Sequence, residues 1–205
     1  MKNHREKNMN IPQPERRLKL GFTLIEMLIV ISIIAVLAAL AVPASSVAMR
    51  MVKKVRTQAA LKDLTLGIKQ YQVEYSRYPV PPDYKSEQPI PLTQGSGILK
   101  VLMGTNEQNM NARGIAFLEP AVAKNGTGGL TGTAGSYGYM DLWGEPYRVV
   151  MDVNYDNKIA NPDTGNSDQM VSQGAPTELV VGAISYSHGE DRQPKTRDDI
   201  ASWRN

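Results

Sequence analysis

The chain has 205 residues, of which 41% are apolar and 21% are charged, so it is long enough for one modest domain with an additional membrane segment. It contains no cysteine, which excludes disulfide bonds and sites built on cysteine thiolates. The formal charge of +3 is uneven: residues 1–21 carry +4 and residues 22–205 carry −1, and without a basic stripe interleaved with aromatic residues nucleic-acid binding is not expected.

Residues 1–21 form a polar, basic segment, and residues 22–42 form an apolar run. Eighteen of the 21 residues in the run are apolar. As a helix, the run would extend roughly 31 Å, which is close to the hydrocarbon thickness of a bilayer. Glu26 is ionisable, and an acid near the centre of a membrane helix costs about 2.5–3.5 kcal/mol on insertion scales. We therefore expect Glu26 to have a function.

Three interpretations of the apolar run are open. A secretory signal peptide would use Ala39-Leu40-Ala41 as its cleavage site, although the run is longer than the usual apolar core and contains a carboxylate. A signal anchor would leave the run uncleaved. Its orientation is not decided by the positive-inside rule, because the basic leader precedes the run and four further basic residues follow it: Arg50, Lys53, Lys54 and Arg56. A third kind of signal is cleaved before the run.

The sequence GFTLIE, from Gly21 to Glu26, resembles the prepilin cleavage motif of type IV pilins and type II secretion pseudopilins. The resemblance extends to the basic leader and to Pro43 at the usual kink position. It implies that a prepilin peptidase cleaves between Gly21 and Phe22 and that the new Phe22 amine is methylated. It also implies that Glu26 of one subunit pairs with the Phe22 amine of its neighbour in a helical filament. A close pair of opposite charges is tolerated in apolar surroundings, where either charge alone is strongly destabilised.

Helical character continues over residues 43–78. An apolar stripe at spacings of three and four predicts a face packed on the protein's own sheet over residues 61–75, and a shorter stripe, formed by Val47, Met51 and Val55, precedes it. The resemblance implies that the N-terminal half of the helix packs in the filament core. Pro43 is expected to bend or locally open the helix, and Gly67 to add a soft point. Pro79 predicts that the helix ends near Tyr75.

Residues 79–140 are predicted to be a variable connecting region. Residues 98–103 predict a short helix, residues 114–118 a short strand or turn, and residues 124–138, with five glycines, a flexible loop. Residues 141–205 are predicted to hold the C-terminal sheet, with strands at 147–153 and 178–186 and a polar loop at 161–176. The expected fold class is α+β: a pilin-like fold in which a long N-terminal helix, its first half transmembrane, packs on a small antiparallel β-sheet.

The segment from Asp141 to Tyr147 resembles the start of the sheet in major pseudopilins, and its Trp143 and Tyr147 are expected to be packing residues. Residues 186–191 and 198–203 resemble the terminal loop of the major pseudopilin of type II secretion, a loop that binds calcium in that family. The resemblance implies four calcium ligands: Ser187, Asp191, Asp198 and Asp199. Clustered oxygen ligands suit this cation. In place of the family's glycines this loop has Arg192, Pro194, Lys195 and Arg197, and its cations could replace calcium by direct ion pairing.

A second acidic segment contains Asp152, Asn154 and Asp156, with Asp163 at the twelfth position counted from Asp152. The spacing partly fits an EF-hand loop, although Asn157 stands where glycine is preferred and no flanking helices are indicated. A tight turn in which Asp and Asn side chains accept backbone hydrogen bonds explains the same residues equally well.

Catalysis is not expected, because the histidines are only His4 and His188, cysteine is absent, and no phosphate-binding loop is present. The resemblance implies a structural subunit of a type II secretion pseudopilus, held in the bacterial inner membrane with its C-terminal domain in the periplasm. Its partners would be further copies in a helical filament, the prepilin peptidase, the inner-membrane assembly platform and minor pseudopilins. The alternatives are a major or minor type IV pilus subunit for adhesion, motility or DNA uptake, and a membrane-anchored periplasmic binding module that does not polymerise.

Overall fold

In the computed structural model of the chain, the described residues are 21–133 and 135–204, and side chains are not described for residues 40–44. The predicted leader, apart from Gly21, lies outside the described residues. The chain divides into two units, Met1–Ser46 and Val47–Asn205. The C-terminal unit is a mixed α+β structure, as the sequence predicts.

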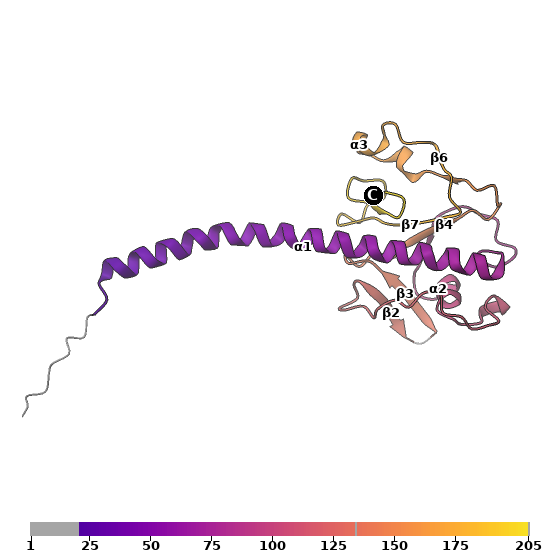
Figure 1. Ribbon diagram of the computed structural model, residues 1–205, viewed down its shortest axis with the longest axis horizontal. Coiled ribbons are helices and arrows are strands. Elements are labelled where there is room, and N and C mark those ends of the chain that lie inside the picture. Colours follow the sequence, from indigo (N-terminus) through magenta and orange to yellow (C-terminus); the bar gives the residue numbers. More distant parts are fainter. Residues whose placement is uncertain (1–20, 134, 205) are drawn as a thin grey trace, which may run out of the picture. The chain divides into compact units, whose positions relative to one another are not determined.

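Helix α1 runs from Leu24 to Tyr75 (Figure 1). Its predicted end is confirmed: Ser76 has a φ of +51°, and Pro79 disfavours helical geometry at the residue before it. The helix continues through position 43, so Pro43 does not end it. The side chain of Pro43 lies outside the described ones, and the bend expected there stays a prediction.

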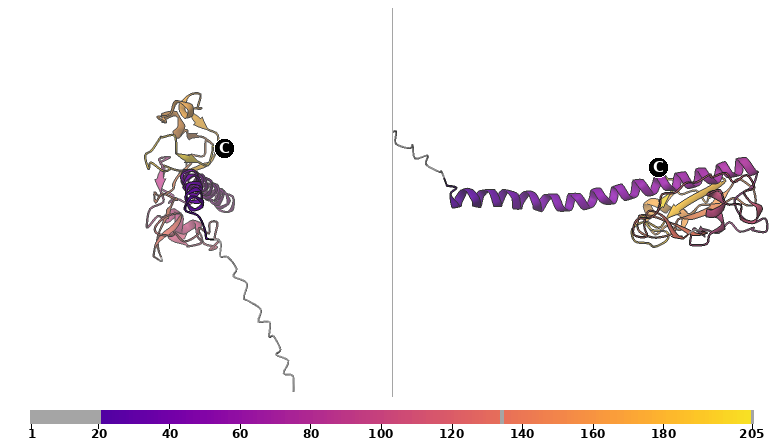
Figure 2. Two further views of the ribbon diagram at one scale, coloured as in Figure 1. Left: turned by 90° about the vertical axis from the view of Figure 1, so that its left-hand side faces the viewer. Right: turned by 90° about the horizontal axis from the view of Figure 1, so that it is seen from below.

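The C-terminal part of α1 forms one wall of the core. Four residues at helical spacing have no exposed surface: Leu61, Leu64, Ile68 and Tyr71. Tyr75 packs against the same core and is partly buried. Figure 2 (right) shows that the strands and loops lie on one side of this part of the helix. The predicted stripe over residues 61–75 is therefore confirmed, whereas the residues of the earlier stripe are each more than half exposed: Val47, Met51 and Val55.

The main sheet has four antiparallel strands: β1 (Ile90–Pro91), β4 (Arg148–Met151), β7 (Ala183–Ser187) and β8 (Ile200–Ala201), in the order β1-β4-β7-β8. At its centre Val149 of β4 is paired with Ser185 of β7. The buried hydroxyl of Ser185 donates to the carbonyl of Leu61 at 2.8 Å and lies 2.7 Å from the hydroxyl of Thr65. These contacts fix the register between the sheet and helix α1.

The predicted strand over residues 178–186 is in fact two strands. Strand β6 (Glu178–Leu179) pairs with β5 (Ile159–Ala160) in a separate two-stranded sheet, and β7 alone joins the main sheet. Between β6 and β7 the N–H of Val181 donates back to the carbonyl of Leu179 at 3.0 Å. This tight turn interrupts the ladder, although the sequence there is continuously apolar.

The flexible loop predicted over residues 124–138 is wrong in its second half. Strands β2 (Gly129–Thr133) and β3 (Ser136–Met140) form an antiparallel hairpin in which Leu130 faces Tyr139. Tyr139 is 6% exposed, and its ring centroid lies 4.6 Å from that of Tyr147. Burial of this aromatic face outweighs the low strand preference of the glycines. The alternation of Tyr137 and Tyr139 was the sequence signal for the strand.

Short elements complete the C-terminal unit: α2 (Gly97–Leu102), α3 (Gln169–Ser172) and the 3-10 helices η1 (Glu107–Asn109) and η2 (Pro162–Gly165). The short helix predicted at residues 98–103 is confirmed by α2. Where a short strand or turn is predicted, at 114–118, the structure has an isolated bridge between Ala116 and Met103, and the turn lies just before it, at residues 112–113. In the view of Figure 1 the hairpin β2–β3 and α2 lie below the line of α1, and α3 and β6 lie above it.

Gly67 is a packing position. A Cβ built on Gly67 would lie 2.7 Å from the carbonyl oxygen of Phe117 and 3.6 Å from the Cβ of Leu118. Phe117 and Leu118 therefore pack directly against the backbone of α1 at Gly67. Helix α1 is unbroken at Gly67, so the soft point expected there stays a prediction. The glycine is explained by this close approach, which a larger side chain would prevent.

Candidate processing and assembly site

The peptide bond predicted to be cleaved lies in an exposed, non-helical segment. Gly21, Phe22 and Thr23 precede α1, and Phe22 is 78% exposed. A protease requires a substrate bond that can be drawn into an extended conformation, and a bond outside the helix meets that requirement without unfolding it. The structure thus places Gly21 and Phe22 where processing can reach them.

Glu26 forms hydrogen bonds with Thr23, the residue that immediately precedes helix α1. Its Oε2 accepts hydrogen bonds from the Thr23 backbone N–H at 2.7 Å and from the Thr23 hydroxyl at 2.8 Å. In return, the Glu26 N–H donates to the Thr23 hydroxyl oxygen at 3.2 Å. This reciprocal arrangement is a capping box, which satisfies N–H groups that have no partner within the helix. It directs the Glu26 carboxylate toward the helix N-terminus, the end at which Phe22 lies.

The described apolar side chains that follow are exposed and pack on no other described part of the chain. Leu24 is 86% exposed, and the described apolar residues up to position 37 remain exposed by the same measure. Such a surface is stable only against lipid or another protein. In the described part of the chain, from which the side chains of residues 40–44 are excluded, no helix is both long enough and apolar enough to cross a bilayer.

The terminal loop starts at Ser187, which is tied to Asp141. The buried Ser187 hydroxyl donates to Oδ2 of Asp141 at 2.5 Å and accepts the Gly189 N–H at 3.0 Å. The other Asp141 oxygen accepts the N–H groups of Trp143 and Glu145 at 2.8 and 2.9 Å. Asp141 is fully buried, so the turn that starts the sheet and the start of the terminal loop share one carboxylate. Ser187 is used here as a structural hydroxyl.

The three predicted aspartate ligands accept hydrogen bonds from within the loop. Asp198 accepts the Asp191 N–H at 2.9 Å and the Thr196 hydroxyl at 2.8 Å. Asp199 accepts the N–H groups of Lys195 and Thr196 at 2.8 and 3.2 Å. Asp191 accepts the N–H of the residue two positions on, Gln193, at 2.7 Å. Each carboxylate therefore closes a turn of its own.

The neighbouring carboxyls of Asp198 and Asp199 have pKa values that are shifted in opposite directions. Burial acts to raise the pKa of the Asp198 carboxyl, but hydrogen bonds from the Asp191 N–H and the Thr196 hydroxyl favour its charged form, and its pKa lies below 3.8. For Asp199 burial prevails and raises the pKa to about 6, against the opposing effects of the Lys195 and Thr196 N–H groups and the Arg204 guanidinium.

The described residues contain no group of three His, Cys, Asp or Glu side chains placed to hold a metal ion. In this arrangement the predicted ligands do not converge, because their oxygens face loop N–H and hydroxyl groups, and calcium stays a prediction. The alternative of direct ion pairing in the loop is not realised by the arginines: Arg192 donates to the carbonyl of Trp143 at 2.6 Å, and Arg197 pairs with Asp168 at 3.4 Å.

The second acidic segment forms the predicted turn. Asp152 accepts the N–H groups of Asp156 and Asn157 at 3.1 and 2.7 Å, and Asn154 accepts the same Asp156 N–H at 2.8 Å. Asp156 in turn accepts the Lys158 N–H at 2.9 Å. The oxygens of this segment are thus used by its own backbone, as in an Asx-type turn.

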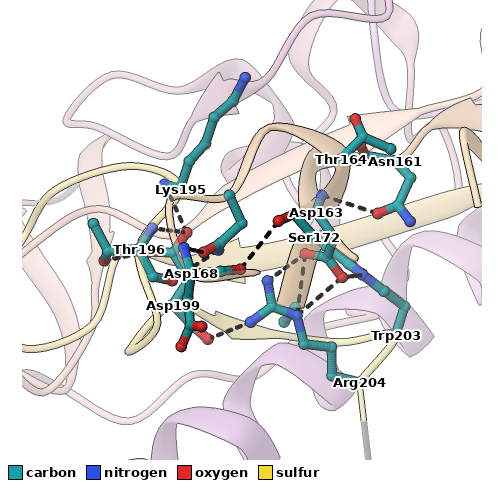
Figure 3. A network of polar contacts seen from close by, with 12 residues as sticks. Asn161, Asp163, Thr164, Asp168, Ser172, Lys195, Thr196, Asp199, Trp203 and Arg204 are labelled. Atoms are coloured by element: carbon teal, nitrogen blue, oxygen red, sulfur yellow. Dashed lines mark hydrogen bonds and ion pairs between the residues drawn. The ribbon is translucent and has the colours of Figure 1, made fainter. Parts of the chain in front are cut away.

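Asp163, at the twelfth position of the weak EF-hand match, binds the C-terminal end of the chain instead. Its carboxylate forms an ion pair with the Arg204 guanidinium, whose Nε lies 3.1 Å from Oδ1 and 3.0 Å from Oδ2. The same carboxylate accepts the Trp203 indole N–H at 2.8 Å (Figure 3). Asp163 is 7% exposed. The same guanidinium donates to the Asp199 carbonyl at 3.0 Å. The last residues of the chain are thereby fastened to the segment containing η2.

Sequence reasoning missed Asp141 and Asp163 as anchors. The signal available for Asp141 was its place before Trp143-Gly144, since an aspartate often accepts the N–H two residues on. For Asp163 there was no local signal, because its partners lie 40 and 41 residues further along the chain. Trp143 and Tyr147 were predicted as packing residues; Tyr147 is 2% exposed, and Trp143 packs against the core and is partly buried.

Comparison with known proteins agrees with the geometry of the N-terminal segment. Residues 16–42 match the prokaryotic N-terminal methylation motif. No curated protein and no solved structure matches the chain. The matched segment contains the exposed Gly21–Phe22 bond and the capped Glu26. The match covers 27 of the 205 residues and supports a type IV pilin-like N-terminal segment, of the kind that prepilin peptidase processes.

Proposed function

We propose that the chain is a structural subunit of a type II secretion pseudopilus, which waits in the inner membrane and assembles into a helical filament that helps to export folded proteins. The match over residues 16–42 carries the proposal, because it contains the exposed bond between Gly21 and Phe22 and the carboxylate of Glu26. Residues 22–42 would lie in the bilayer before assembly, with the C-terminal unit in the periplasm. A helical fibre follows when each subunit contacts the next without closing a ring.

The preference for a pseudopilus over a pilus rests on the C-terminal end of the chain. Many type IV pilus subunits close a C-terminal loop with a disulfide bond, and this chain has no cysteine. Here Trp203 and Arg204 are fastened to Asp163 by hydrogen bonds and an ion pair, and Ser187 is fastened to Asp141. These contacts support a terminal loop that is held without a covalent link, as the resemblance to the major pseudopilin implies.

The proposed processing is tested by expressing the full chain together with a prepilin peptidase and determining the N-terminus of the product by mass spectrometry. We expect a mature chain that begins with N-methylated Phe22. Cleavage after Ala41 would instead identify a secretory signal peptide, and an intact chain would identify a signal anchor. A Gly21→Leu variant is the matched control, because it should remain uncleaved while the apolar run is unchanged.

The two filament functions are separated by deletion of the gene in the source bacterium. Loss of exoprotein release with surface pili intact supports the pseudopilus, whereas loss of pili with secretion intact supports a type IV pilus. A binding module that does not polymerise would yield no filaments on overexpression in either case. We propose no enzymatic activity for the chain.

A further inference from the structure

Four basic residues lie within seven positions of helix α1: Arg50, Lys53, Lys54 and Arg56. We call them the basic collar. Residues 57–205 carry a net charge of −4, so the collar is a net positive segment of four cations that precedes a net acidic remainder of the chain. Three of the four side chains are exposed, and Lys53 is half-buried. This cluster was not explained by processing, by assembly or by the positive-inside rule.

The C-terminal unit neutralises the collar only in part. Arg50 pairs with Glu190 at 3.2 Å, in an exposed contact, and Lys53 lies 5.9 Å from the centroid of the Trp143 ring. Within the described residues, Lys54 and Arg56 make no ion pair. Asp198 shares a groove of about 260 Å³ with Arg50 and Lys54, but its oxygens accept hydrogen bonds from the terminal loop.

Exposed apolar side chains alternate with these cations. Met49 is 60% exposed and Met51 is 65% exposed, and both lie in the same two turns of α1 as the collar. Trp143 lies beside Val47 and Met51 in the groove described above. A helix surface that combines Lys and Arg with exposed apolar residues and a nearby tryptophan is typical of the boundary between lipid headgroups and water.

The collar begins about two helical turns after the apolar run ends at residue 42. Helical side chains lean toward the N-terminus of their helix, and Lys and Arg extend their charged groups along flexible stems. Both effects direct the charged groups of the collar toward the N-terminal end of their own helix. We propose that the basic collar binds anionic phospholipid headgroups on the membrane face where the C-terminal unit lies. This inference rests on the proposed membrane insertion of residues 22–42.

The test uses the full chain in detergent micelles and native mass spectrometry. Dioleoyl-phosphatidylglycerol and dioleoyl-phosphatidylcholine are added separately, and the Kd of each lipid is obtained from the bound and free protein signals. A collar variant carries Lys53→Gln, Lys54→Gln and Arg56→Gln. A control variant carries three substitutions of exposed lysines elsewhere in the unit: Lys62→Gln, Lys69→Gln and Lys85→Gln. The leader charges are the same in all three proteins, so differences report on the substituted residues.

We expect wild type to bind phosphatidylglycerol about tenfold more tightly than phosphatidylcholine, the collar variant to lose most of that preference, and the control variant to keep it. The preference should weaken as the ionic strength rises. Equal affinity of wild type for the two lipids, or equal affinities of the collar and control variants, would overturn the proposal. So would an unchanged lipid preference together with a lower dimer signal in the collar variant, because the collar would then contact a second copy.

Unfolding temperatures of all three proteins show whether the variants are folded. Lipid affinity is measured on unassembled subunits, whereas the proposed function is tested by N-terminal processing and by secretion. The lipid-binding proposal can therefore fail while the proposed function holds, and the reverse is also possible.

Discussion

Trp203 donates its indole N–H to the carboxylate of Asp163 at 2.8 Å, across 40 residues of sequence. The Arg204 guanidinium pairs with the same carboxylate, and the Nη1 of Arg204 donates a hydrogen bond to the carbonyl of Asp199. One buried acid thereby orients the side chains of two consecutive residues near the C-terminus. Since Gln58 of α1 also donates to the carbonyls of Ala201 and Arg204, at 2.9 and 3.0 Å, the C-terminal end is held on two sides.

Replacement of Asp163 by alanine should destabilise the C-terminal unit strongly. The substitution leaves the Arg204 guanidinium and the Trp203 N–H without their acceptor in a largely buried place, and removal of one partner of a buried pair costs about 3–5 kcal/mol. We expect the lower end of that range, because the Arg204 side chain is 25% exposed. Urea unfolding of the full chain in detergent, followed by circular dichroism, measures the loss.

Glu178→Ala is the matched control for this substitution. Glu178 also pairs with a basic residue, Lys158, but both side chains are 52% exposed. Exposed pairs contribute about 0–1 kcal/mol. Equal losses from the two substitutions would show that the buried contacts of Asp163 do not stabilise the fold.

Gly67→Ala should also destabilise the protein, although alanine favours helix by about 1 kcal/mol over glycine. The added methyl group would lie 2.7 Å from the Phe117 carbonyl oxygen, and such overpacking typically costs about 1–3 kcal/mol. Gly97→Ala in α2 is the control, since a Cβ there meets no atom within 4 Å. Thermal unfolding should place Gly67→Ala below wild type and Gly97→Ala at or above it. The reverse order would mean that the chain at Phe117 can move away at little cost.

The elements that periodicity could predict are those whose signal is local. Residues 61–75 repeat at helical spacing, so their buried face and the end of α1 near Tyr75 followed from the sequence. The hairpin β2–β3 did not follow from the sequence, because its glycines favour the prediction of a loop. The strand is stabilised by packing of Tyr139 on Tyr147, a tertiary contact that local sequence does not reveal. The partners of Asp163 and Ser187 could not be found locally either, since each contact joins residues more than 35 positions apart in the chain.

Asp199 should make the protein less stable as the pH rises from about 4 to 6. Burial raises the pKa of its carboxyl from 3.8 to about 6, so between these values the folded chain keeps a proton that the unfolded chain has released. Stability therefore falls with rising pH over this window. Asp198 acts in the opposite direction and at lower pH: its stabilising contribution is present above 3.8 and is lost as the pH falls through its lowered pKa.

The contribution of Asp199 is isolated by an Asp199→Asn variant. The difference in the free energy of unfolding between wild type and variant should decrease as the pH rises through the window from about 4 to 6, with a chelator present throughout. Asp83→Asn, at an exposed acid, is the reference substitution. A wild-type minus Asp199→Asn difference that stays constant over the window would contradict the raised pKa.

The hydrogen bonds of the terminal loop and the resemblance to the major pseudopilin predict different effects of calcium. If the N–H and hydroxyl donors that satisfy Asp198 and Asp199 hold the loop by themselves, the thermal midpoint of the full chain will be the same in calcium and in chelator. A structural ion at a hundredfold excess over its Kd would instead stabilise the fold by about 2.7 kcal/mol. A rise of the midpoint in calcium that Asp198→Asn abolishes would establish the ion.

Glu26→Ala should leave processing intact and impair assembly. The proposed cleavage is at the exposed Gly21–Phe22 bond, which the substitution does not alter. Removal of the carboxylate makes the apolar run easier to insert. In a filament, however, the Phe22 amine would lose its opposite charge in apolar surroundings, where an unpaired ammonium is strongly unfavourable. The mature N-terminus is checked by mass spectrometry, and the filament yield by electron microscopy of sheared material.

The control must separate charge pairing from the capping box, because alanine removes both. Glu26→Gln can still accept the N–H and hydroxyl of Thr23, the two contacts that the Glu26 carboxylate makes at the start of α1. Glutamine is a capping-box residue in its own right, so it preserves the helix start while removing the negative charge. If pairing with the Phe22 amine sets the register, Glu26→Gln should assemble as poorly as Glu26→Ala. Filament yield restored to the wild-type level by glutamine would assign the role of Glu26 to capping instead.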